Sequence, residues 1–161
     1  MESAALSFRQ EFFDAGERTI FGSYKWDTCR YTYGEWLQII KNNLSAETAN
    51  PKFGISETYF SVNASGRIVG ILNFRHELTP FYANSGHIGL SVRPSERRNG
   101  YAAAMLRESL ALARAAGLTE GKLVCRESNI ASAKTILKNG GSLFRTFEEE
   151  NIRYTEYRVM L

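Results

Sequence analysis

Three arginines and a glycine lie close together between an apolar run and a segment with helical periodicity. Residues 92–102 read VRPSERRNGYA, and the charged positions are Arg93, Arg97 and Arg98, followed by Gly100. A helix N-terminus carries unpaired N–H groups and a partial positive charge, so a strand that runs directly into a helix forms an anion site. Arginine side chains add positive charge, and glycine lets the backbone approach a ligand closely. The stretch therefore predicts a site for phosphate groups.

Two common nucleotide-binding motifs are excluded by the residues around Gly100. A P-loop needs Gly-Lys-Ser/Thr and a dinucleotide fingerprint needs G-x-G-x-x-G, and the chain has neither here. The small side chains of Ala102 and Ala103 leave room for a pyrophosphate across the first helical turn. A nucleotide that is not used for metal-assisted phosphoryl transfer fits these residues better, and coenzyme A is such a ligand.

The same run resembles the central motif of the GNAT superfamily of N-acetyltransferases. That motif is Arg/Gln-x-x-Gly-x-Gly/Ala after a strand ending in Val-x-Pro, and Arg97, Gly100 and Ala102 occupy its three defining positions. A second family pattern places an Asn, and then a small residue three positions on, at the start of the next helix. Asn129 and Ser132 match it.

The resemblance extends over about residues 58–147 by the order of elements, and it implies acetyl-CoA as cosubstrate with no metal. The pantetheine arm would pair with the backbone of one strand, the loop amides would cradle the pyrophosphate, and Lys134 or Lys138 would reach phosphate or adenine. The cofactor-binding residues implied in this way are Leu90, Ser91, Val92, Arg97, Arg98, Asn99, Gly100, Tyr101, Ala102, Ala103, Asn129 and Ser132.

Direct transfer of an acetyl group to an amine requires a polarised thioester carbonyl and a proton for the leaving thiolate. Backbone N–H groups near Val92 are candidates for the first task. The tyrosine that many family members carry seven residues after the asparagine is Ile136 here, so that route to the proton is closed. Tyr154 is the predicted acid, with Tyr82, Tyr157 and water as alternatives.

The amine must also lose a proton, which requires a general base. Glu77 is the predicted base because it follows a long apolar strand run, and His76 beside it is an equal alternative. Glu127, just before Asn129, is a third candidate. Each of these side chains also fits an ordinary role on the protein surface.

The acceptor is expected to be a primary amine of a small molecule, a peptide or a protein. In this superfamily the N-terminal helices and the terminal hairpin shape the acceptor site, which here means residues 12–45 and 144–157. Both segments mix aromatic and acidic side chains, which suit a cationic or amphiphilic amine. The alternative function is a non-catalytic acyl-CoA-binding or sensing module on the same fold.

Composition limits the other functions. The 161 residues suit a single domain, residues 1–161, and 20 basic against 17 acidic side chains give a net charge of +3. That charge is too small to predict a nucleic-acid or membrane partner, although a homodimer remains possible. Cys29 and Cys125 are far apart and without metal-ligand spacing. An acidic N-terminus and the absence of a long apolar run favour a cytoplasmic protein.

Elements that would position these residues follow from periodicity and turn signals. Thr32 and Glu35 have capping-box spacing before a helical pattern, and Gly117 ends another. The order predicts a mixed α/β fold with one layer of sheet and helices on both faces, and the resemblance implies a GNAT-like fold whose central sheet is mostly antiparallel. Expected helices are 4–15, 32–44, 100–116 and 129–141, and expected strands are 58–62, 67–78, 87–94, 122–127, 142–147 and 152–161.

Several side chains allow a structural as well as a functional interpretation. The aromatic residues Phe8, Phe12, Phe13 and Trp36 fit either a hydrophobic core or an apolar wall of the acceptor site. Cys125 is expected to be a buried small apolar residue, because no base lies next to it in sequence. His87 is expected to have a structural or surface role.

Overall fold

The computed structural model describes residues 1–161 and contains four α-helices, six strands and three short 3-10 segments. The helices are α1 (Glu2–Asp14), α2 (Tyr33–Asn42), α3 (Tyr101–Ala115) and α4 (Ile130–Lys138). The strands are β1 (Ser56–Val62), β2 (Ile68–Arg75), β3 (Ile88–Val92), β4 (Glu120–Arg126), β5 (Ser142–Glu149) and β6 (Ile152–Met160). All ten expected elements are present, with ends that differ by a few residues. No helix has the length and apolar character needed to cross a membrane.

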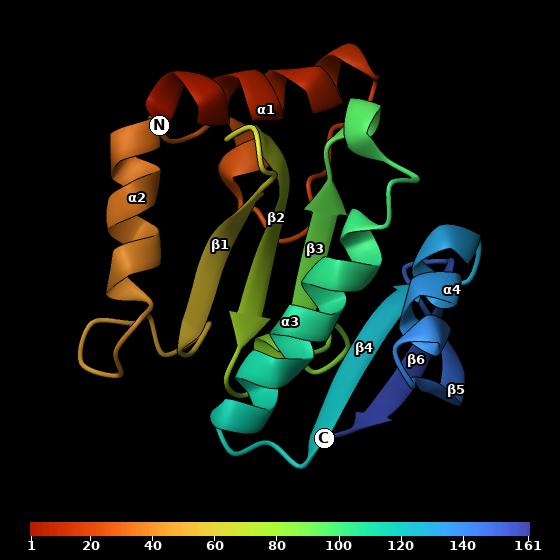
Figure 1. Ribbon diagram of the computed structural model, residues 1–161. Helices are drawn as coiled ribbons and strands as arrows, with labels where there is room; N and C mark the ends of the chain where they lie inside the picture. Colours follow the sequence, from red (N-terminus) through yellow and green to blue (C-terminus); the bar gives the residue numbers. More distant parts are fainter.

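The strands form two antiparallel sheets of three strands each, in the orders β1-β2-β3 and β4-β6-β5. The single layer expected from the sequence is therefore divided. Outside the named strands, one isolated bridge joins Gly86 to Leu123. From that point β3 and β4 diverge toward their C-terminal ends (Figure 1). We refer to this arrangement as the β3–β4 divergence.

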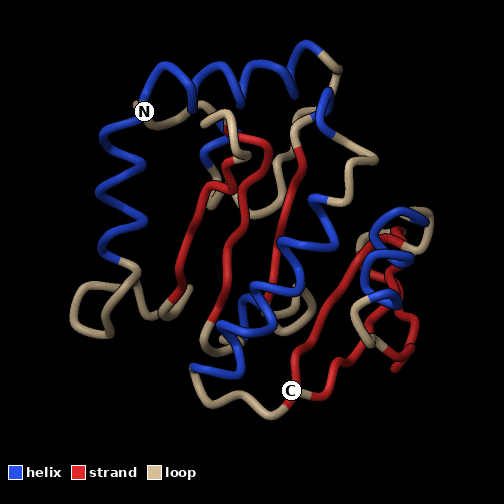
Figure 2. The backbone as a smooth tube through the Cα atoms, in the orientation of Figure 1, coloured by secondary structure: helices blue, strands red, loops and turns tan.

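Strand β2 is the centre of the first sheet, as its apolar run predicted. Its residues are buried on both faces, from Ile68 to Phe74. Leu72 packs with Met105 of α3 on one face, while Ile71 packs with α1 and α2 on the other. A Cβ atom at Gly70 would lie 2.5 Å from the Met105 sulfur, so any side chain there would displace the end of Met105. Helices thus cover both faces of the sheet (Figure 2).

The face under α1 and α2 holds an aromatic core. Phe8, Phe12, Trp26 and Trp36 are at most 1% exposed, and the two indoles stack with centroids 4.7 Å apart. The core interpretation is therefore correct for Phe8, Phe12 and Trp36, whereas Phe13 is only partly buried. Helix α2 begins with the predicted capping box, in which Thr32 accepts a hydrogen bond from the amide N–H of the third helical residue.

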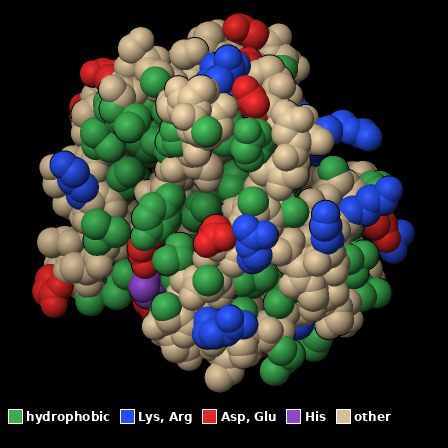
Figure 3. All heavy atoms as spheres, in the orientation of Figure 1, with side chains coloured by type: hydrophobic (Ala, Val, Ile, Leu, Met, Phe, Trp, Pro, Cys, Tyr) green, Lys and Arg blue, Asp and Glu red, His purple; other side chains and the backbone are tan.

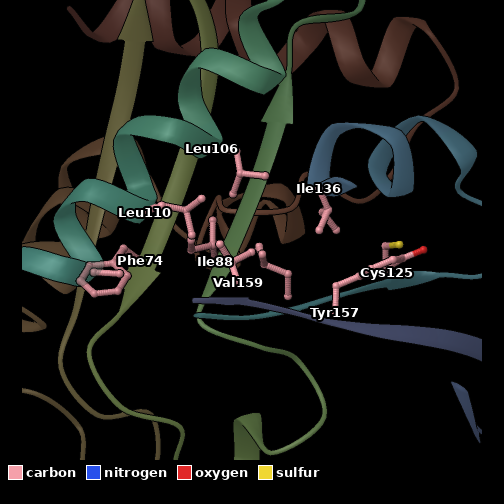
Figure 4. Close-up of a cluster of buried hydrophobic side chains, with 10 residues drawn as sticks. Phe74, Ile88, Leu106, Leu110, Cys125, Ile136, Tyr157 and Val159 are labelled. Atoms are coloured by element: carbon pink, nitrogen blue, oxygen red, sulfur yellow. The ribbon is translucent and has the colours of Figure 1, made fainter. Parts of the chain in front are cut away.

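A second core lies between the two sheets and helices α3 and α4 (Figure 4). It contains Leu106 and Leu110 from α3, Ile136 from α4, and Cys125 and Tyr157 from the second sheet. Burial raises the pKa of the Cys125 thiol. As expected, Cys125 is thus a buried apolar residue rather than a nucleophile.

Helix α1 is fastened to the residues that follow β3. Glu11 accepts hydrogen bonds from the buried Arg93 Nε at 2.5 Å and from the Ser95 amide at 2.8 Å. Burial by itself would raise the pKa of Glu11, but the hydrogen bonds from Ser95 and Arg93 outweigh it and hold this pKa at about 2. The chain that leads into α3 is therefore held by a residue far away in the sequence.

We expect Glu11→Gln to lower the free energy of unfolding by about 2 kcal/mol near pH 7, because it leaves the Arg93 guanidinium without its counter-charge. The folded pKa of about 2 lies below the ordinary value of 4.5, so this stabilisation is present above about pH 4.5 and is lost as the pH falls toward 2. Urea unfolding of both proteins at several pH values measures the difference.

The exposed Glu108 of α3 supplies the control, because Glu108→Gln removes a charge without a buried partner. The free energy of unfolding of Glu11→Gln should approach that of the wild type as the pH falls from about 5 toward 2. A difference in this free energy that stays constant over the same range would contradict the role of Glu11.

Candidate functional site

The N-terminus of α3 presents a run of free backbone donors. The amides of residues 98–103 have no acceptor within the protein, and the first bond of the helix runs from Ala104 N to Gly100 O at 3.1 Å. Gly100 has a φ of +83°, a left-handed conformation that glycine adopts without steric cost. Arg98 has the same conformation with a φ of +67°. These turns direct consecutive N–H groups into one anion-binding nest.

The side chain of Arg97 does not lie in this nest. Its guanidinium makes a two-pronged ion pair with Glu17, at 2.6 and 2.8 Å, and its Nε donates to Val92 O. The hydrogen bond from Arg97 lowers the pKa of Glu17, so the pair is ionised at neutral pH. The charge of Arg97 is thus neutralised within the protein, and the exposed Arg98 is the cation of the loop that has no acidic partner.

The edge of β3 that faces β4 has free backbone groups. Arg75 N donates to His87 O and Arg93 N donates to Val69 O, both at 2.8 Å, so residues 87 and 93 are bonded to β2. Bonding directions alternate along an antiparallel pair. The intervening Leu90 and Val92 therefore direct their N–H groups toward the β3–β4 divergence.

Ser91 differs from its neighbours, because it lies opposite Ile71 in the pairing of β2 with β3. The same alternation directs its backbone groups to β2. On β4, Glu127 N donates to Arg153 O, and Leu161 N donates to Thr119 O. The backbone of Val124 on β4 therefore faces β3. Free donors and acceptors line both sides of the divergence.

Helix α4 begins beside the same region. Asn129 is its N-cap, and its side-chain oxygen accepts a hydrogen bond from Ser132 N at 3.1 Å. Both Asn129 and the two lysines of α4, Lys134 and Lys138, are exposed. Figure 3 shows basic side chains over α4 and at the loop that precedes α3. Positive charge therefore borders both sides of the α3 N-terminus.

His87 closes the other end of the divergence. Its amide donates to Lys122 O at 2.8 Å, and its ring Nδ1 accepts from Lys122 N at 3.0 Å. Burial, followed by the nearby charges of Arg158 and Arg75, lowers the pKa of His87. The ring is therefore neutral at pH 7 with its proton on Nε2. The structural role expected for His87 is confirmed.

The predicted base lies apart from these groups. Strand β2 ends at Arg75 rather than at residue 78, so Glu77 is exposed beyond its end. The Glu77 side chain lies against Gly54, in the turn before β1. The neighbouring His76 is paired with Glu57 at 2.6 Å. The structure does not bring these side chains to the free edge of β3, and a base role for Glu77 stays a prediction.

The candidate acids occupy different places. Tyr154 is half-buried and stacks on Phe147 with centroids 5.5 Å apart. Tyr82 lies against the guanidinium of Arg75. Tyr157 is 7% exposed and belongs to the core that contains Ile136 and Cys125. Figure 4 shows the Tyr157 hydroxyl at the same end of this core as the Cys125 sulfur.

Burial, followed by the charge of Cys125, raises the pKa of Tyr157, so its hydroxyl keeps its proton at neutral pH. Among the three candidate tyrosines, this is the one on the side of the sheets that α3 and α4 cover.

Two charged side chains near the site were not singled out by sequence analysis. Glu17 has no local signal, because its partner Arg97 is remote in the sequence. Arg75 does have a local signal in the sequence, because it is the only charged residue of the mostly apolar run IVGILNFR and stands at its end. No group of three or more His, Cys, Asp or Glu side chains could hold a metal ion.

Several solved structures have the same fold. The protein YncA from Salmonella typhimurium, solved with its cofactor acetyl-CoA, is 14% identical, with a TM-score of 0.67 over 98% of this chain and 87% of that chain. A GNAT-family protein from Bordetella pertussis is 15% identical, with a TM-score of 0.66 over 98% and 88%. A spermidine N-acetyltransferase from Vibrio cholerae, SpeG, is 9% identical, with a TM-score of 0.64 over 99% and 91%.

Sequence comparison gives the family. No curated protein matches the chain in sequence. The model of the acetyltransferase (GNAT) family matches residues 11–140, which is more than half of the chain. The matched segment includes the loop before α3, the free edge of β3 and the start of α4. The protein therefore belongs to the GNAT family of acetyltransferases.

Proposed function

We propose that the protein is an N-acetyltransferase that moves the acetyl group of acetyl-CoA directly to a primary amine while both substrates are bound. The observation that carries this proposal is the run of free amides at residues 98–103, next to the free backbone edges of β3 and β4. A pyrophosphate needs many donors and no facing carboxylate, and an extended amide-containing arm needs an unpaired strand edge. The residues present therefore fit coenzyme A.

The residues have distinct parts in this proposal. The amides from Arg98 to Ala103 and the Arg98 side chain hold the pyrophosphate. The backbone groups of Leu90 and Val92 hydrogen-bond to the pantetheine arm, whereas those of Ser91 are directed to β2. The side-chain NH2 group of Asn129 is free to donate to the same arm, because only the side-chain oxygen is used in capping α4.

When bound, acetyl-CoA supplies an activated acyl group as its thioester. Free backbone N–H groups of β3 are positioned to stabilise the negative charge that develops on the carbonyl oxygen. Tyr157 is the proposed proton donor to the leaving thiolate, because it stays protonated at neutral pH and lies beside Cys125 under the divergence. Tyr154, the acid predicted from the sequence, is the competing candidate.

One observation favours the alternative of a non-catalytic acyl-CoA-binding module. Ile136 is 4% exposed and lies inside the core, at the position where many family members carry a tyrosine. Release of free thiol from acetyl-CoA in the presence of a panel of amines separates the two functions. Binding without release for every amine would favour the module.

We expect acetyl-CoA to raise the thermal midpoint by several degrees, because a ligand at a hundred times its Kd adds about 2.7 kcal/mol. ATP should have little effect. Gly100→Val should abolish the acetyl-CoA shift, since a valine at φ +83° would distort the nest.

Gly117→Val is the matched control. Gly117 has a φ of +87° and open space around its Cα, as Gly100 does, but it lies at the other end of α3. Both variants should lose about 1–2 kcal/mol of stability from backbone strain. Loss of the acetyl-CoA shift in both, or in neither, would contradict the placement of the pyrophosphate.

A second variant pair tests the proton donor. Tyr157→Phe should lower kcat by about a hundredfold and leave the KM for acetyl-CoA nearly unchanged, because it removes only the transferable proton. Tyr154→Phe removes the equivalent hydroxyl from the other face of the sheet. If Tyr154→Phe is the variant that loses kcat, the acid is Tyr154 and our choice of Tyr157 is wrong.

A further inference from the structure

Arg75 is a charged side chain in a mostly buried position. It ends β2 and lies on the face of the sheet that α1 and α2 cover, two positions after Asn73. No Asp or Glu lies within ion-pair distance of its guanidinium. Its closest charge-stabilising contact is the ring of Tyr82, whose centroid is 4.1 Å away.

The hydrogen bonds of Arg75 leave the Nε group of its guanidinium unpaired. Nη1 donates to Gly86 O at 2.8 Å, while Nε is buried and has no partner. The Tyr82 hydroxyl lies within reach of the guanidinium, and a Cβ atom at Gly89 would lie 3.7 Å from Nη2. The Nε and Nη2 groups form the edge that binds a carboxylate through two parallel hydrogen bonds.

Other unsatisfied polar atoms surround this edge. Ser56 lies directly opposite Arg75 on β1, and its buried hydroxyl has no partner. Asn43 Nδ2 and Asn73 Oδ1 are also buried without partners. Asn43 O accepts a hydrogen bond from Ser56 N, and Asn73 lies two positions before Arg75 on β2. Buried polar groups are almost always paired, so this cluster is a place where water or a polar ligand would supply the missing partners.

The charges near Arg75 do not neutralise it. Arg158 and Lys122 are close enough to lower the pKa of His87, but both pair with the fully buried Glu156, and Arg158 also pairs with Glu120. The guanidinium of Arg75 itself contacts the ring of Tyr82 and the carbonyl of Gly86. The charges of Arg158 and Lys122 are therefore compensated within the protein, whereas the charge of Arg75 is not.

The position of Arg75 relates it to the reaction. Its Nη1 binds Gly86, which bridges to Leu123 at the closed end of the β3–β4 divergence. A pantetheine arm that starts at the α3 loop and follows β3 inward ends toward this point. The loop between α1 and α2 covers the same place, where a Cβ atom at Gly22 would lie 2.5 Å from Gly89 O.

We propose that Arg75 binds a carboxylate of the acceptor, so that the amine acetylated by this protein belongs to an amino acid or a similar amino-carboxylate and not to a polyamine. This inference rests on the proposed function, because it assigns the acceptor of the same reaction. It differs from the cationic or amphiphilic amine that the aromatic and acidic residues of segments 12–45 and 144–157 suggested.

The experiment compares L-amino acids with their own amides as acceptors, using thiol release from acetyl-CoA. Each pair differs only in the carboxylate, and aliphatic, aromatic and acidic side chains should each be represented. The amide has the more easily deprotonated amine, so a preference for the acid reports recognition rather than reactivity. We expect at least one acid to exceed its amide, and spermidine, by about a hundredfold in kcat/KM.

Variants assign the preference to the guanidinium. Arg75→Met should bring the ratio of acid to amide close to one by raising the KM for the acid, while the KM for acetyl-CoA stays unchanged. Arg75→Lys should keep part of the preference, because it keeps the charge without the two-pronged geometry. Arg114→Met, on the exposed face of α3, is the control and should keep the full preference.

Three outcomes would overturn the proposal. In the first, the amides or spermidine are acetylated as efficiently as the acids. In the second, Arg75→Met lowers the melting temperature without changing the ratio of acid to amide in kcat/KM, which would show that Arg75 has a purely structural role. In the third outcome, acetyl-CoA raises the melting temperature, but no amino acid is acetylated and none raises the melting temperature further. In this last case the cofactor assignment stands and the carboxylate site fails, whereas no shift with acetyl-CoA would contradict the proposed function itself.

Discussion

Two hydrogen bonds between His87 and Lys122 hold the sheets together at one end, and the candidate site depends on them. Beyond this point β3 and β4 diverge, and the backbone groups of Leu90 and Val124 lose the partners that a continuous sheet would provide. Each polar group left unpaired in a buried position costs about 1–3 kcal/mol. A divided sheet is therefore costly unless the free edges meet solvent or a ligand, and an amide-containing arm satisfies both edges at once.

The anion-binding loop is held in place before any ligand arrives. Arg98 and Gly100 both adopt left-handed conformations, and consecutive amides point in one direction, which is unfavourable by itself. The ion pair of Arg97 with Glu17 and the hydrogen bond that the Ser95 amide donates to Glu11 offset this cost. Glu11 lies in α1 and Glu17 lies three residues after its end. The N-terminal helix and the turn that follows it therefore fix a loop that is remote in sequence. Such preorganisation lowers the entropic cost of binding.

Local signals in the sequence predicted the parts of the structure that local physics determines. The capping box of Thr32 and Glu35, the helix end at Gly117 and the terminal hairpin all arise from residues a few positions apart. The division of the sheet was not predicted, because periodicity identifies strands but not the partners that they lack. The capture of Arg97 by Glu17 was missed for the same reason. Both depend on contacts between segments that the chain order does not bring together.

Two arginines, Arg75 at the end of β2 and Arg93 directly after β3, show how burial separates structure from function. Arg93 is 6% exposed, and its guanidinium is bonded to Glu11, Ser7 and a backbone carbonyl, so its charge is compensated. Arg75 lacks an acidic partner, and burial lowers its pKa, which means that folding works against its charge. An apolar side chain of similar size would be less costly there. A charge that weakens the fold needs another explanation, and the proposed carboxylate of the acceptor supplies one for Arg75.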